Sequence, residues 1–377
     1  MRPTVADIDL AALAANYQAI EAFLTQSTQL GSRSRPPSII AVVKANAYGH
    51  GAAPVALALE RAGARAFACA DIEEGVQLRR AGVGGKILVF GALGISDLEG
   101  VFEYGLTPTI STPSACRALE AAARKHGTRL ACQLKIDTGM NRLGFRFDNL
   151  ARTMVEVRES AHLEIEAVYT HFATADDVDG ELFGEQRERF NLAIGELASL
   201  GIAPAVRHAA NSAALIRDER VWFEAVRPGL LLYGLVPPPL ATTLPLVPVM
   251  SLVSRVVAVK GQRGGESVGY GARHRRDVPA RTAVVPAGYA DGLDLRLGGR
   301  GFVLVRGLRA PIIGAVSMDM ITIDVTGIDI EPGDEVVLVG TQGSDRIDVR
   351  EIAAAISTIP YELLCRIGSR IERRYRG

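Results

Sequence analysis

The stretch Ser38-Ile-Ile-Ala-Val-Val-Lys44-Ala-Asn-Ala-Tyr48-Gly-His-Gly51 decides the fold class. Its apolar part, Ile39–Val43, is rich in β-branched residues, which is typical of a strand buried on both faces, as in a parallel sheet. Lys44 follows directly, where such a strand should emerge. Desolvation disfavours the ammonium form of a lysine in this position, so Lys44 is a candidate Schiff-base nucleophile. The alternative is a strand-end lysine whose charged group extends to water.

The residues after Lys44 indicate a turn that could lie against a ligand. They contain a phenol, Tyr48, and two glycines, Gly49 and Gly51. Glycine lets a backbone approach another molecule closely, so the turn strengthens the case for a binding site beside Lys44.

Apolar runs alternate with helical patterns from Ser38 onward, and this rhythm predicts the architecture. The runs expected to form strands are Ile39–Val43, Ala66–Ala70, Ile87–Phe90, Thr107–Ile110, Leu130–Ile136, Ile165–Tyr169, Ala205–Arg207 and Phe223–Val226. Eight strand–helix units predict a TIM-like (β/α)8 barrel of the α/β class. Asp9 is expected to cap a first helix, Asp71 and Glu74 to form a capping box, and Pro113–His126 to be helical.

A barrel of this kind carries its site at the C-terminal ends of its strands, and polar residues gather at those positions. They follow the first, fifth, sixth, seventh and eighth predicted strands. In that order they are Lys44; Lys135, Asp137 and Arg142; His171; His208, Asn211 and Ser212; and Arg227 and Gly229.

The pattern changes after a Pro-rich linker, Val236–Pro248. Strand-like runs separated by Gly-rich turns then predict a mostly β domain. These runs are Leu252–Val259, Ala283–Pro286, Phe302–Val305, Ile312–Val316, Ile321–Val325 and Glu335–Val339. We therefore expect a barrel domain over residues 1–240 and a β domain over 241–377.

Three further segments complete the expected organisation. Gln26–Pro37 is predicted to be a polar loop, Ile347–Ser357 a helix, and Arg370–Arg376 a solvated basic end.

Composition narrows the class of function. The 377 residues carry 42 basic and 42 acidic side chains, and this balance argues against binding to nucleic acid or to a membrane surface. The N-terminus lacks an apolar signal-peptide core, and no apolar segment is long enough to span a bilayer. The four scattered cysteines are expected to be free thiols in a reducing cytoplasm.

The segment Lys44-Ala-Asn-Ala-Tyr48-Gly-His-Gly51 resembles the pyridoxal-phosphate signature of bacterial alanine racemases. Further stretches similar to that family follow in family order along nearly the whole chain. They are Leu134–Gly144, Arg227–Leu230, Glu266–Gly271, Ala287–Gly292 and Val316–Met320.

The resemblance implies a site that holds pyridoxal 5'-phosphate and no metal. Lys44 and Tyr270 would be the two catalytic bases, one for each face of the substrate. The cofactor would contact Lys44, Tyr48, Arg142, His171, Asn211, Ser212, Arg227, Gly229, Leu230 and Tyr361. Arg142 and Met318 would bind the substrate, and Tyr289 and Tyr361 would narrow the entrance.

Individual roles also come from the resemblance. Arg227 would lie beside the pyridine nitrogen and, because arginine stays protonated, would leave that nitrogen unprotonated. Lys135 would either carry a carbamate that orients Arg142 or remain unmodified and pair with Asp137. Tyr270 would reach the active site of a neighbouring subunit, so a homodimer with shared sites is expected.

Taken without the resemblance, these residues have structural explanations. Ser212 is equally explained as a helix N-cap and Gly229 as a turn residue. A structural salt bridge explains Arg227, and packing explains Tyr270 and Met318.

The implied activity is interconversion of L-alanine and D-alanine in the cytoplasm, with D-alanine supplied to peptidoglycan synthesis. The alternatives are a non-catalytic pyridoxal-phosphate carrier, a racemase of broader specificity, an amino-acid decarboxylase on the same barrel, and a cofactor-free binding protein. A carrier would lack the second domain, and a decarboxylase would need an acidic partner for the ring nitrogen where Arg227 stands.

Overall fold

The computed structural model describes residues 3–30, 34–91 and 97–377 and divides into two compact units. Unit 1 contains Met1–Ala12, Tyr48–Gly51 and Pro248–Gly377. Unit 2 contains Leu13–Ala47 and Ala52–Val247. No helix among the described residues is both long enough and apolar enough to cross a bilayer.

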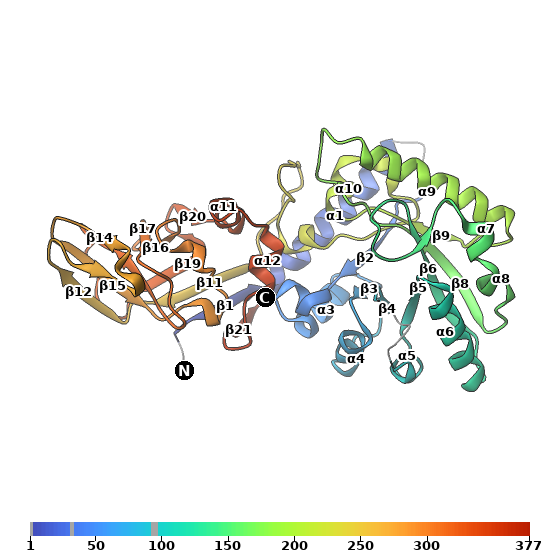
Figure 1. Ribbon diagram of the computed structural model, residues 1–377, viewed down its shortest axis with the longest axis horizontal. Coiled ribbons are helices and arrows are strands. Elements are labelled where there is room, and N and C mark those ends of the chain that lie inside the picture. Colours follow the sequence, from blue (N-terminus) through green and yellow to red (C-terminus); the bar gives the residue numbers. More distant parts are fainter. Residues whose placement is uncertain (1–2, 31–33, 92–96) are drawn as a thin grey trace. The chain divides into compact units, whose positions relative to one another are not determined.

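Unit 2 is a closed barrel of eight parallel strands (Figure 1). The strands are β2 (Ser38–Val42), β3 (Ala66–Cys69), β4 (Lys86–Val89), β5 (Thr107–Ile110), β6 (Leu130–Asp137), β8 (Leu163–Tyr169), β9 (Val206–His208) and β10 (Ala225–Val226). Pairing between β5 and β6 and between β10 and β2 closes the ring. The predicted (β/α)8 barrel is confirmed, with all eight strands at the expected positions.

Helices follow most of the barrel strands, and the longer ones form the outer layer (Figure 1). They are α2 (Lys44–Tyr48), α3 (Ala52–Arg61), α4 (Ile72–Arg80), α5 (Glu99–Glu103), α6 (Pro113–Lys125), α7 (Leu150–Thr153), α8 (Val155–Glu159), α9 (Leu182–Ser199) and α10 (Ser212–Arg217). Shorter elements are β7 (Phe145–Arg146), η1 (Glu219–Val221) and η2 (Leu230–Tyr233). Thr112 caps α6 by accepting a hydrogen bond from the N–H of Ala115, which explains where the predicted Ala-rich helix begins.

Burial explains why the first barrel strand is so apolar. Every residue of Ile39–Val43 is at most 6% exposed, as expected for a strand covered on both faces. The last of them, Val43, donates its N–H to the carbonyl of Ala68 in β3, so the backbone is fixed directly before Lys44.

The first helix, α1 (Leu10–Leu30), begins where predicted and ends later than predicted. The carboxylate of Asp9 accepts the N–H of Ala12 at 2.8 Å, which is an N-cap bond. The predicted loop Gln26–Pro37 is wrong for its first residues, because the helix continues to Leu30; residues 31–33 lie outside the described part. Thr28 is buried there, and its hydroxyl donates to the carbonyl of Leu24 at 2.8 Å, so this part of the segment packs as helix.

Unit 1 is organised around a large, mostly antiparallel sheet (Figure 1). Its strands are β1 (Val5–Asp9), β11 (Met250–Arg255), β12 (Ala258–Gln262), β15 (Ala280–Val285), β16 (Phe302–Val305), β17 (Leu308–Ile313), β18 (Ile321–Asp324), β19 (Glu335–Gln342), β20 (Asp345–Ile347) and β21 (Glu372–Arg376). A separate hairpin joins β13 (Ser267–Val268) to β14 (His274–Arg275). Smaller helical elements are η3 (Tyr270–Ala272), η4 (Tyr289–Asp291), η5 (Leu295–Leu297), α11 (Val349–Ala355) and α12 (Pro360–Cys365). The expected mostly β C-terminal region is confirmed.

The two ends of the chain differ from expectation. Strand β1 pairs antiparallel with β11 and parallel with β21, so the first strand belongs to the β sheet, whereas the expected division placed all of residues 1–240 in the barrel domain. The predicted solvated end, Arg370–Arg376, is mostly exposed as expected, but its last five residues form a strand, β21, which was not predicted. Backbone pairing to β1 holds this strand, although most of its side chains are exposed.

One segment predicted as a single strand forms two strands in the structure. The apolar run Leu252–Val259 is interrupted between β11 and β12, where Val256 donates its N–H to Asp334 and Val257 to Val284. The chain turns there from one partner strand to another. The predicted helix Ile347–Ser357 is confirmed as α11, and α12 was not predicted.

We predict that Gly144→Ala destabilises the barrel by about 1–3 kcal/mol. Gly144 has φ +121°, and an added Cβ would lie 2.8 Å from the backbone nitrogen of Asp137. Gly127→Ala is the matched control: its φ is +62° and an added Cβ meets nothing within 4 Å, so only the left-handed conformation is penalised, by about 1 kcal/mol. Denaturant midpoints of the two variants measure the difference, and equal midpoints would contradict the close approach at Gly144.

Candidate active site

Lys44 lies at the C-terminal end of β2, half-buried, and begins a turn of unusual handedness. In α2, Ala45, Asn46 and Ala47 have φ of 52–53° and ψ of 46–52°, and Tyr48 has φ 53°. These are left-handed helical values. For L-residues other than glycine they cost about 1–2 kcal/mol each, so the turn carries on the order of 4–8 kcal/mol of strain. Such strain persists only where surrounding contacts determine the backbone, and it is common at functional sites.

The two glycines of this segment have a structural explanation that differs from the predicted approach to a ligand. An added Cβ on Gly49 would lie 2.1 Å from the carbonyl oxygen of Leu364. One on Gly51 would lie 1.9 Å from the hydroxyl of Tyr375. Both contacts are within unit 1, so the glycines admit neighbouring chain segments.

Arg227, directly after β10, is 3% exposed and holds its guanidinium inside the barrel. Its Nη2 donates to the carbonyl oxygens of Thr170 (2.7 Å) and Ala209 (3.0 Å). Its Nη1 donates to Nδ1 of His208 at 2.7 Å, and Nδ1 of His171 lies 3.4 Å from Nη2. Burial lowers the pKa of Arg227 to about 10, which leaves the group charged at neutral pH. Among the described residues, Arg227 forms no ion pair, so the predicted salt-bridge alternative has no partner there.

A chain of polar side chains fixes the state of His208. Because a guanidinium only donates, Nδ1 of His208 must accept, and Nε2 therefore carries the proton. Nε2 donates to Oε1 of Gln133 at 2.9 Å, and the amide of Gln133 donates to Glu166 at 3.0 Å. Burial and the charge of Arg227 lower the pKa of His208 well below its ordinary value, so the ring is neutral.

Tyr169 is the central aromatic group of the site and was not predicted from the sequence. Its ring stacks on His208 with centroids 4.8 Å apart, and the guanidinium carbon of Arg227 lies 5.2 Å from its centroid. The ammonium nitrogen of Lys135 is 5.7 Å from the same ring. The hydroxyl of Tyr169 lies 3.0 Å from that of Thr109. The sequence offered one signal for such residues, a polar group in an otherwise apolar strand. Tyr169 ends one such strand, and Gln133 lies inside another.

The mouth of the barrel is strongly cationic. Burial and the charges of Arg142, Arg227 and Lys44 lower the pKa of Lys135 to about 8, against the opposite effect of Asp137. Burial, Arg227, Lys135, Lys44 and Arg142 likewise lower the pKa of His171 well below its ordinary value. The residues predicted at the first, fifth, sixth and eighth strand ends are therefore close enough to influence one another electrostatically.

The loop after β6 presents Arg142. Asp137 accepts the backbone N–H groups of Gly139 (3.0 Å) and Asn141 (3.1 Å), and Arg142 is exposed at the turn that these bonds fix. Within the described residues, no ion pair joins Lys135 to Asp137, whose carboxylate is used by the loop backbone.

The residues expected to bind a phosphate in unit 2 are linked through one hydroxyl. Ser212 is buried, and its Oγ accepts the N–H of Gly229 at 2.9 Å and that of Leu231 at 3.4 Å. The side chain of Asn211 caps α10 by accepting the N–H of Ala214. Ser212 therefore joins the seventh and eighth strand ends and retains a hydroxyl proton to donate, while Leu230 begins η2 directly after Gly229.

The remaining predicted residues belong to unit 1. Tyr48 is 7% exposed, its ring centroid is 5.9 Å from that of Tyr361, and burial raises the pKa of its phenol. Tyr270 begins η3 between β13 and β14 and is 77% exposed, while Met318 is 52% exposed. The carbonyl of Met318 accepts the N–H of Ala290, next to Tyr289, at 3.1 Å.

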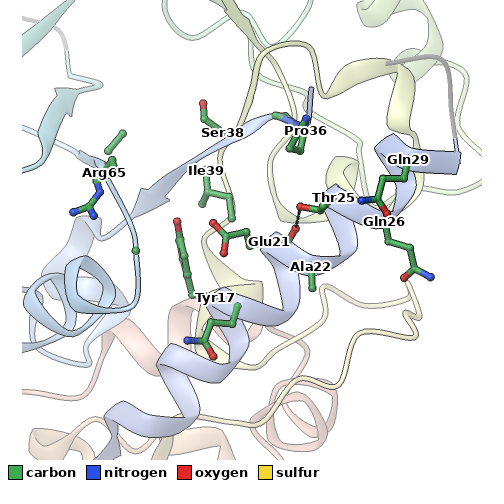
Figure 2. Close-up of a pocket in the computed structure, with 14 residues that line it drawn as sticks. Tyr17, Glu21, Ala22, Thr25, Gln26, Gln29, Pro36, Ser38, Ile39 and Arg65 are labelled. Carbon is green, nitrogen blue, oxygen red and sulfur yellow. Dashed lines mark hydrogen bonds between the residues drawn. The ribbon is translucent and has the colours of Figure 1, made fainter. Parts of the chain in front are cut away.

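A separate pocket of about 710 Å³ lies at the opposite ends of the barrel strands (Figure 2). Figure 2 shows Tyr17 and Glu21 of α1 beside Ser38 and Ile39, where β2 begins. Burial and the charge of Glu21 raise the pKa of Tyr17 to about 12. Barrel enzymes carry their active sites at the C-terminal ends of the strands. This pocket lies at the N-terminal ends, so it is not the expected position of the active site.

The donor set in unit 2 fits an anionic cofactor with a heterocyclic nitrogen. The hydrogen bonds of the described residues leave Nε–H and one Nη1–H of Arg227 to meet another acceptor. Ser212 offers a hydroxyl proton, and Lys44 offers an amine at a strand end. A buried charge without an acidic partner is expensive unless a ligand supplies acceptors.

Two family models match the chain, the N-terminal domain of alanine racemase over residues 8–237 and its C-terminal domain over 249–375. The chain belongs to the alanine racemase family. A relative from Symbiobacterium thermophilum named alanine racemase is 40% identical, with 100% of this chain and 98% of the relative covered. The solved alanine racemase of Streptomyces lavendulae is 34% identical, with TM-score 0.93 and coverage of 100% and 98%. That of Bacillus anthracis, solved with bound L-Ala-P, is 34% identical, with TM-score 0.91 and coverage of 100% and 96%.

Membership of the alanine racemase family agrees with the geometry of unit 2. The chain covers its relatives over nearly their whole length, so both domains of the family are represented. The buried arginine and the strand-end lysine thus lie in a barrel that the family shares.

We predict that Lys135 reacts with a small acylating reagent with a half-maximal rate near pH 8, because burial and neighbouring cations favour its neutral amine. Lys125 is the comparison within the same protein, since its hydrogen bond to Glu99 raises its pKa above the ordinary 10.5. Removing one cation with Arg142→Gln should move the Lys135 profile to higher pH. Peptide mass spectrometry after brief labelling measures both lysines, and identical profiles would contradict the electrostatic description.

Proposed function

We propose that the chain racemises alanine, using pyridoxal 5'-phosphate held at the mouth of the barrel. The observation that carries this proposal is a buried, charged Arg227 with free donors and no acidic partner among the described residues, in a barrel where Lys44 lies just beyond the end of β2. Bound there, the cofactor would withdraw electrons from the substrate α-carbon and acidify its proton.

The residues of unit 2 would hold the cofactor as follows. Lys44 would bind its aldehyde carbon, Arg227 would donate to its ring nitrogen, and Ser212 with the Gly229–Leu230 backbone would face its phosphate. Because the guanidinium cannot accept a proton, the ring nitrogen would stay unprotonated. This limits electron withdrawal and favours return of the proton over side reactions.

Further contacts would come from the other predicted residues. Asn211 would support the phosphate site through its cap of α10, and Tyr48 and Tyr361 would contact the phosphate. His171 would lie beside Arg227, and Arg142 with the backbone of Met318 would bind the substrate carboxylate.

Racemisation requires a proton to leave one face of the α-carbon and another to arrive on the opposite face. A single base does not reach both faces easily, so two are proposed. Lys44 would serve one face and Tyr270 the other. Tyr289 and Tyr361 would narrow the entrance and leave room only for a methyl side chain, which would favour a substrate as small as alanine.

A homodimer with shared sites is part of the proposal. Tyr270 is 77% exposed within unit 1, and Met318 and Tyr289 are exposed with it. A catalytic base must be shielded from water to act on the substrate alone. The cationic barrel mouth of a second copy would provide that shield and would receive Tyr270 opposite Lys44.

Lys135 is proposed to be available for carbamate formation. Carbon dioxide reacts with a neutral amine, and the pKa of about 8 leaves an appreciable neutral fraction at physiological pH. A carbamate would place a negative charge among Arg142, Arg227 and Lys44, which would relieve their mutual repulsion.

The competing functions are less well supported. A non-catalytic carrier would not need the C-terminal domain that matches over residues 249–375. A decarboxylase would need a carboxylate at the position of Arg227. We propose a cytoplasmic location because Cys69, Cys116 and Cys132 are buried thiols outside any disulfide, as is usual in a reducing compartment. D-Alanine would then serve peptidoglycan synthesis.

We predict that Lys44→Ala abolishes exchange of the alanine α-proton with deuterated solvent from both enantiomers. Tyr270→Phe should slow exchange from L-alanine by about 10²–10⁴-fold, the usual contribution of a positioned base, and affect D-alanine less. Proton NMR of each enantiomer in deuterated buffer measures both rates. Unchanged exchange in Tyr270→Phe would refute the two-base assignment, and wild-type protein that neither exchanges the proton nor binds pyridoxal phosphate would refute the function.

We predict that mixing Lys44→Ala with Tyr270→Phe restores activity. Random exchange of subunits makes half of the dimers mixed, and each mixed dimer has one site with both bases, so about a quarter of all sites recover. Activity after mild dissociation and reassociation, compared with each variant treated alone, measures this. No recovery despite verified subunit exchange would mean that each site draws both bases from one chain.

A further inference from the structure

The left-handed turn after Lys44 is held by a side chain from the next strand–helix repeat of the barrel. Glu74 lies in the first turn of α4 and is half-buried. Its Oε1 accepts the backbone N–H of Ala45 at 2.7 Å. Ala45 is the first left-handed residue and the immediate neighbour of Lys44. The carboxylate therefore acts on the backbone at the point where handedness changes.

The second oxygen of Glu74 holds the neighbouring strand end. Oε2 accepts the backbone N–H of Ala70, directly after β3, at 2.8 Å. Strands β2 and β3 are adjacent and parallel, with Val42 paired to Ala68. One carboxylate thus joins the ends of two barrel strands, and hydrogen bonds to an ionised acceptor are stronger than those between neutral groups.

Helix capping alone does not account for this arrangement. The N–H of Glu74 donates to Asp71 at 2.8 Å, which is half of the predicted capping box. In the usual box the glutamate side chain returns to the N–H of the cap residue. Here its oxygens bind Ala70, one residue earlier, and Ala45, 29 residues away. The bond to Ala45 is therefore additional to the cap.

The sequence of the turn shows why such a bond is required. Ala45 and Ala47 have no intrinsic preference for left-handed backbone. Asn46 tolerates it and adds one contact, since its side-chain oxygen accepts the N–H of Ala52 at 2.8 Å. Glycine would adopt this conformation without steric cost, but the first glycine is Gly49. The turn must therefore be fixed by its surroundings.

We propose that Glu74 is a positioning residue for Lys44. Its carboxylate clamps the first peptide of the left-handed turn and so fixes the backbone from which the Lys44 amine extends. The proposal rests on the proposed function, in that Lys44 is taken to be the cofactor-binding amine and one catalytic base.

The test compares three variants in the cofactor-loaded protein: Glu74→Gln, Glu74→Gln combined with Ala45→Gly, and the control Thr112→Ala. Glutamine keeps the size of the side chain but loses its charge and one acceptor. Thr112→Ala removes the cap of α6 in the same barrel without contact to the turn. Ala45→Gly supplies a residue whose backbone adopts the left-handed conformation without steric cost, so it does not need the bond from Glu74.

We expect Glu74→Gln to speed deuterium exchange of the backbone amides of residues 44–51 by about tenfold, as for loss of one charge-assisted hydrogen bond. The kcat of α-proton exchange should fall by about tenfold with KM nearly unchanged, because Lys44 is misplaced while the carboxylate site is intact. Ala45→Gly should restore most of kcat in the double variant. Thr112→Ala should alter neither measurement, although it lowers thermal stability.

Two outcomes would overturn the proposal. If Glu74→Gln matches wild type in both measurements, the clamp has no effect. If the variant instead loses activity and stability without rescue by Ala45→Gly, Glu74 is only a helix cap. Wild-type protein that never binds pyridoxal phosphate would instead overturn the proposed function, and amide exchange in residues 44–51 would still report on the clamp.

Discussion

The buried charge of Arg227 is the constraint on which the site depends. A guanidinium inside a barrel must direct its N–H groups to acceptors, and it does so to the carbonyls of Thr170 and Ala209 and to Nδ1 of His208. This choice makes His208 a neutral ring protonated at Nε2, which in turn requires Gln133 as an acceptor. Since no carboxylate of the described residues neutralises Arg227, the barrel mouth stays positive, and the pKa values of Lys135 and His171 fall in response. A site of this charge is suited to an anionic ligand.

The sequence was informative where one physical requirement dominates. A strand buried on both faces must be apolar, so the sequence predicts a strand at Ile39–Val43. The end of that strand then gives the position of Lys44. Strand ends converge in a barrel, so polar residues distant in sequence can be grouped from the sequence alone. The same logic failed inside strands: Gln133 and Tyr169 lie within or at the end of apolar runs, and their importance depends on partners supplied by β9 and by Arg227.

Handedness and end pairing could not be predicted because they arise from distant contacts. Nothing in Ala45-Asn46-Ala47 favours left-handed backbone, and the group that meets this turn, Glu74, is 29 residues from Ala45. Strand β21 is polar and mostly exposed, so it shows no alternation; it is a strand because β1, at the other end of the chain, offers a backbone edge. From the sequence, Gly49 and Gly51 likewise resemble ligand-facing glycines, but in the structure Leu364 and Tyr375 occupy the space beside them.

The proposed sharing of sites follows from what each unit lacks by itself. Unit 2 has the amine, the buried arginine and the cationic mouth, but the second predicted base is in unit 1. There Tyr270 stands between two left-handed glycines, Gly269 (φ 72°) and Gly271 (φ 73°), which lift it out of the hairpin and leave it 77% exposed. A tyrosine raised in this way gains nothing for the packing of its own unit. Its exposure is explained if it enters a cationic barrel mouth that lacks the second base. In a symmetric dimer each copy would provide both the tyrosine and such a barrel mouth.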